Sequence, residues 1–132
     1  MKITIPISVL LVLLIASCGG DKPNQINNLK DEVMGLHDEV MPKMGDLRKA
    51  SKSLMMKAET LDSTSAAKLK VIAEDIEAAN EFMMDWMRQY EPDMEGTDEE
   101  LLEYYKAQRA GIQEVKERML NALEQGQKAL SE

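Results

Sequence analysis

The feature that most constrains the fold is a helical spacing of apolar residues that runs from residue 26 almost to the end of the chain. Positions three, four or seven apart are apolar, and the pattern never changes to strand-like alternation. The first segment contains Ile26, Leu29, Val33, Leu36, Val40, Leu47, Leu54 and Leu61. The second contains Leu69, Ile72, Ile76, Ala79, Met83, Trp86 and Tyr90, and the third contains Leu101, Tyr105, Ile112, Val115, Met119, Ala122 and Ala129. Three long amphipathic segments predict an all-α protein.

Short connections separate the three segments. The polar stretch 62–65 (DSTS) is typical of a turn with several possible helix N-caps. The second helix should end before Pro92, because the residue that precedes a proline avoids helical geometry. Thr97 followed three residues later by Glu100 is a capping-box pattern for the third helix. We therefore expect one domain, an antiparallel three-helix bundle over residues 25–132.

The first segment contains residues that weaken a helix. Gly35, Pro42 and Gly45 fall within eleven positions. An interior proline costs about 3 kcal/mol and removes the hydrogen bond to the carbonyl four residues earlier, here that of Asp38. The first helix is therefore expected to be kinked near Pro42, or to be two helices. Such a break can mark a functional site, or it can let the helix wrap around the bundle.

The N-terminus has the pattern of a secretory signal peptide. Lys2 precedes the apolar run 7–16, which is too short for a permanent membrane span of roughly twenty residues. The sequence 15–18 (IASC) resembles the lipobox of bacterial lipoproteins. This resemblance implies a signal peptide over residues 1–17, cleavage before Cys18, acylation of that cysteine with fatty acids such as palmitate, and a lipidated tether over 18–24. The alternative is an ordinary signal peptide with an incidental cysteine.

The resemblance to a lipobox implies a protein of a bacterial cell envelope, anchored in a membrane, and we expect the outer membrane with the bundle facing the periplasm. After cleavage, 15 basic and 24 acidic residues remain, a formal net charge of −9. This charge disfavours binding to nucleic acid or to anionic lipid surfaces. The expected partners are therefore the membrane, through the lipid, and either an envelope protein or a metal ion.

Methionine is unusually frequent in the mature chain, which has ten methionines against eleven leucines. Met34, His37, Met41 and Met44 are spaced by three, four and three, so they share one helix face. A second cluster, Met83, Met84 and Met87, surrounds Trp86. For a hairpin that turns near residue 62, facing residues have numbers that sum to about 124. His37 is then level with Met87, and Met41 with Met83, so the two clusters are expected to adjoin.

Thioethers and an imidazole together favour soft cations such as Cu(I) or Ag(I). An indole beside the cation can add a cation–π contribution. This ligand set resembles that of small periplasmic copper chaperones, which use histidine, methionine and a nearby tryptophan on a different fold. The candidate ligands are His37, Met41, Met83 and Met87, with Met34 and Met44 as alternates and Trp86 as a cap.

Other interpretations of these residues stay open. Methionine fills irregular gaps in cores and packs well against aromatic rings, so the clusters can be ordinary core. An exposed methionine surface can also bind apolar partners, form a dimer seam, or act as a reversible sink for oxidants. An enzyme is not expected. The chain has a single histidine, His37, whose neighbour Asp38 should point to another side of the helix, and it matches no HExxH, EF-hand, P-loop or di-iron pattern.

The segments HDEVMPKMGDL and AANEFMMDWM together resemble a group of small Bacteroidota lipoproteins. The resemblance covers about residues 30–90, and some of these proteins carry the label "viral A-type inclusion protein". It implies an envelope lipoprotein of uncharacterised role and provides no catalytic residues. The expected function is therefore that of a non-catalytic helical binding or structural module, with soft-metal binding as the alternative.

Overall fold

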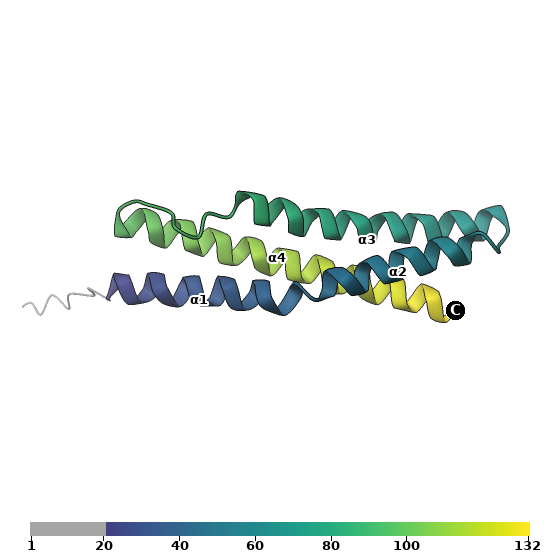
Figure 1. Ribbon diagram of the computed structural model, residues 1–132, viewed down its shortest axis with the longest axis horizontal. Coiled ribbons are helices and arrows are strands. Elements are labelled where there is room, and N and C mark those ends of the chain that lie inside the picture. Colours follow the sequence, from purple (N-terminus) through teal and green to yellow (C-terminus); the bar gives the residue numbers. More distant parts are fainter. Residues whose placement is uncertain (1–20) are drawn as a thin grey trace, which may run out of the picture.

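In the computed structural model, which describes residues 21–132, helices form almost the whole chain (Figure 1). The elements are α1 (Lys22–Val40), α2 (Lys43–Ala58), α3 (Ser63–Gln89) and α4 (Asp98–Ser131). α1 and α2 follow each other along one side of the molecule, and α3 returns antiparallel to them. α4 then runs back beside both. The expected antiparallel three-helix bundle is confirmed, with its first helix broken at Pro42.

The break between α1 and α2 has the cause that the sequence predicts. Pro42 has no N–H to donate, so the helical ladder cannot pass through it unchanged. The N–H groups of Met44 and Gly45 instead donate to the carbonyls of Met41 and Pro42, three residues back, at 3.2 and 3.3 Å. This tight turn lets α1 pack against α4 while α2 packs against both α3 and α4.

The ends of the helices refine the predicted boundaries. α1 begins at Lys22, inside the expected tether, because Pro23 fits the first turn of a helix. Asp62 is the N-cap of α3, and its Oδ1 accepts hydrogen bonds from the N–H groups of Thr64 and Ser65 at 3.0 and 3.1 Å. These bonds, chiefly that from Ser65, lower the pKa of the Asp62 carboxyl. Thr97 and Glu100 form the predicted capping box at the start of α4.

Three ion pairs fix how α1 lies along α4. Lys22 pairs with Glu99, Glu32 with Arg109, and Glu39 with Lys116. In each pair the two residues are 77 positions apart. A constant offset means that the two helices run parallel and keep the same register over about five turns. These pairs are exposed, so each adds little stability, but together they specify the register.

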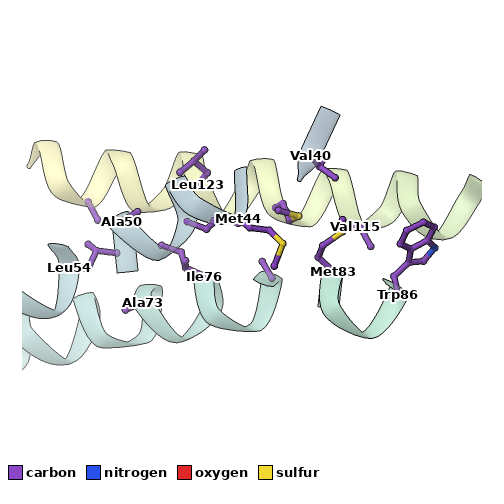
Figure 2. Close-up of a cluster of buried hydrophobic side chains, with 14 of the residues drawn as sticks. Val40, Met44, Ala50, Leu54, Ala73, Ile76, Met83, Trp86, Val115 and Leu123 are labelled. Atoms are coloured by element: carbon purple, nitrogen blue, oxygen red, sulfur yellow. The ribbon is translucent and has the colours of Figure 1, made fainter. Parts of the chain in front are cut away.

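The core lies along the common axis of the helices and includes Leu47, Leu54, Ile76, Met83, Ile112 and Met119, all fully buried. Figure 2 shows Met44 and Met83 among these side chains, with Trp86 at one end of the cluster. Gly126 lets α4 approach α3 closely, because a Cβ at this position would lie 2.7 Å from Cδ1 of Ile76. Within residues 21–132, no helix is long and apolar enough to cross a membrane.

Candidate functional site

Members of the two methionine clusters line a shared hollow between α1 and the C-terminal end of α3. Met34 and His37 of α1, Trp86 and Met87 of α3, and Tyr90 and Pro92 just after α3 line one hollow of about 290 Å³. We call this hollow the α1–α3 groove. The imidazole of His37 and the indole of Trp86 have ring centroids 6.1 Å apart. The hairpin arithmetic thus predicted the right neighbours, since His37 and Met87 share this groove.

The candidate ligands divide into core and surface residues. Met83 is fully buried and Met44 is 5% exposed, so both belong to the core and are removed from the candidate set. Met41 is 39% exposed but lies outside the lining of the groove. Met34, which ranked only as an alternate in the sequence, is equally exposed and does line it. The structure therefore brings together Met34, His37 and Met87.

His37 is held by a neighbour that the sequence reasoning discounted. Its Nδ1 lies 2.9 Å from Oδ1 of Asp38. The expectation that these two side chains point apart is wrong, because adjacent helix positions differ by only about 100° and a carboxylate can reach across that angle. Since a carboxylate oxygen can only accept, Nδ1 is the donor, and the free lone pair of the neutral ring is on Nε2.

Trp86 and Tyr90 form the aromatic wall of the α1–α3 groove. They are one helical turn apart and stack with ring centroids 4.9 Å apart and planes 15° from parallel. Burial raises the pKa of the Tyr90 phenol, and the nearby groups of Tyr105, Tyr104 and Asp93 add to this shift. The phenol is therefore neutral over the ordinary pH range.

Gly111 of α4 supports this wall from behind. A Cβ at that position would lie 3.2 Å from Cδ1 and 3.3 Å from Nε1 of Trp86, so glycine gives the indole closer access to α4 than a larger residue would. Sequence reasoning missed Gly111, Tyr90 and Pro92 as parts of the site. The spacing of four between Trp86 and Tyr90 was the one available signal.

The chemistry of the lining is unusual for a helical bundle surface. It carries two thioethers, an imidazole and a phenol, and none of the six lining residues has a carboxylate. Across residues 21–132, no three His, Cys, Asp or Glu side chains converge in a way that could hold a metal ion. The two thioethers are soft donors, and the lining lacks the thiolates and carboxylates of typical zinc, calcium and magnesium sites.

Five methionines, Met34, Met41, Met55, Met56 and Met84, are exposed by more than a third.

The chain matches no protein family, no curated protein and no solved structure. Cys18, the predicted lipidation site, lies outside the described residues.

Proposed function

We propose that this chain is a non-catalytic binding module of a bacterial cell envelope, anchored through acylated Cys18 and facing the periplasm from the outer membrane. The observation that carries this proposal is the α1–α3 groove, which gathers the single histidine, the single tryptophan and two methionines from segments fifty residues apart.

The position of the groove suits a tethered protein. α1 begins four residues after Cys18. His37 is fifteen residues further along, which corresponds to about 22 Å of helix. A ligand bound there would lie nearer to the start of α1 than to the turn that follows α2 at Ala58.

Membrane fractionation tests the anchor. The wild-type chain should incorporate labelled palmitate and sediment with the outer membrane. Cys18→Ala should lose the label and move to the soluble periplasmic fraction. Equal sedimentation of both chains without labelling would contradict the lipid anchor.

Methionine oxidation rates test whether the groove is occupied in the envelope. Peroxide converts accessible methionine to the sulfoxide, which mass spectrometry measures residue by residue. Met34 and Met41 are matched probes, because they are seven positions apart and both are 39% exposed. In purified protein they should oxidise at similar rates, whereas in native envelopes Met34 should be slower. An unchanged ratio of the two rates would contradict a binding role for the groove.

A further inference from the structure

We infer that the ligand of the α1–α3 groove is a soft monovalent cation, Cu(I), held by the sulfur atoms of Met34 and Met87 and by Nε2 of His37. This inference rests on the proposed binding role of the groove and names its ligand. It also replaces the ligand set that the sequence favoured, because Met83 and Met44 are buried in the core and Met41 lies outside the lining.

The three donors lie in one hollow and come from two helices whose positions are fixed by the core. Met34 and His37 are three residues apart on α1, so they share a face. Met87 follows Trp86, which is itself packed between His37, Tyr90 and Gly111. The imidazole and the aromatic wall are thus already arranged, and the methionine side chains are flexible enough to adjust to a bound ion.

The Asp38 carboxylate would orient His37 by accepting a hydrogen bond from the ring nitrogen that does not bind the metal. A histidine that ligates a metal through one ring nitrogen usually donates a hydrogen bond from the other nitrogen to a carboxylate or carbonyl. Here Nδ1 of His37 pairs with Asp38, which leaves Nε2 as the donor to an ion. The carboxylate also offsets the positive charge of the bound cation.

The donor types decide which cation fits. Thioether sulfur binds Cu(I) and Ag(I) well and binds hard cations poorly, and imidazole accepts copper. The lining has no carboxylate for calcium or magnesium and no thiolate for a closed zinc site. The indole of Trp86 adds an aromatic face beside the cation. The net charge of −9 on the mature chain attracts cations in general.

The size of the groove favours an ion over a protein partner. A stable protein interface buries about 800 Å² on each side. Only six residues line the α1–α3 groove, whereas a standard protein interface uses about 20–30 residues on each side. Partner binding through the groove alone would need a much larger apolar surface around it.

An anaerobic competition titration with a colorimetric Cu(I) chelator tests the inference. The full chain carries Cys18→Ser, because that change removes the only thiol, a strong competing Cu(I) ligand. We expect the protein to withdraw one equivalent of Cu(I) from the chelator. Met34→Leu, Met87→Leu and His37→Gln should each weaken binding at least about tenfold, which is the effect that even outer partners of a ligand can have.

Met41→Leu is the matched control, since Met41 has the same exposure as Met34 but does not line the groove. It should bind like the parent chain, and circular dichroism should show that every variant is folded. The inference is overturned if the parent chain withdraws no Cu(I), or if Met41→Leu weakens binding as much as Met34→Leu does.

The copper inference and the binding role can fail separately. If Met34 is protected from peroxide in native envelopes but the purified chain does not bind Cu(I), the copper inference is overturned and the binding role stands. If Cu(I) binds tightly in vitro but Met34 is unprotected in copper-replete envelopes, the copper-binding chemistry stands and the proposed function is contradicted.

Discussion

Replacing Met83 by alanine should destabilise the bundle far more than replacing Met34 by alanine. Met83 is fully buried in the core cluster, whereas Met34 is 39% exposed at the rim of the groove. The two thioethers look alike in the sequence, and only their positions in the fold distinguish a packing role from a binding role. The difference between the stability losses of the two substitutions therefore shows which methionine belongs to the core.

The magnitude follows from what the Met83 substitution removes. Alanine lacks the Cγ, Sδ and Cε atoms, and burial of three such groups contributes about 2.4 kcal/mol at roughly 0.8 kcal/mol each. A residual cavity of about 50 Å³ would add roughly 1 kcal/mol. The free energy of unfolding should thus fall by about 3.5 kcal/mol. At roughly 4 °C per kcal/mol, the midpoint of thermal unfolding would fall by about 14 °C.

Urea unfolding followed by circular dichroism measures both variants against the parent chain. Met34→Ala should lower the free energy of unfolding by about 1 kcal/mol or less, as is usual for a half-exposed residue. Met56→Ala provides a baseline, because Met56 is 59% exposed. A loss below about 1 kcal/mol for Met83→Ala, or equal losses for Met83→Ala and Met34→Ala, would refute the assignment of Met83 to the core.

Gly35→Ala should raise the free energy of unfolding by up to about 1 kcal/mol, because nothing lies within 4 Å of the new Cβ on α1. Gly126→Ala should lower the urea midpoint, because its Cβ would crowd Ile76; midpoint changes of the same sign would refute this contrast. Asn80→Leu should stabilise the bundle by about 1 kcal/mol or more in the same assay, because neither polar atom of the buried amide has a hydrogen-bond partner among the described residues. Tyr90→Phe should reduce the loss of stability above about pH 10, where the unfolded chain releases the phenolic proton and the folded chain, with its raised pKa, retains it. If burial of Tyr90 were unimportant, the urea midpoint would fall by the same amount in both chains between about pH 9 and pH 11.

The fold was largely predictable because its determinants are local or periodic. The spacing of Leu47, Leu54 and Ile76 predicts which faces are buried, and all three are fully buried. The capping box at Thr97 and the break at Pro42 depend on the chemistry of a few neighbouring residues, and both are present. The exact start of α1 was missed, because Pro23 can belong equally to a tether or to the first turn of a helix.

The site was only partly predictable because it depends on rotation of α1 and α3 about their axes. The rule that facing residues have numbers summing to about 124 predicts that His37 and Met87 lie at the same level along the hairpin. It does not predict which methionines face the core. Met83 and Met34 exchanged roles for this reason, the first joining the core and the second lining the groove. The contact of Gly111 with Trp86 depends on α4, which the hairpin arithmetic does not include.

The most direct test of the central claim is the NMR spectrum of the chain with ¹³C-labelled methionine methyl groups during titration with Ag(I), a soft and diamagnetic substitute for Cu(I). We predict that the methyl signals of Met34 and Met87 shift together and saturate at one equivalent, while those of Met41, Met56 and the buried Met119 stay in place. Uniform small shifts of all exposed methionines, or no shifts at one equivalent, would contradict the assignment of the α1–α3 groove as the binding site.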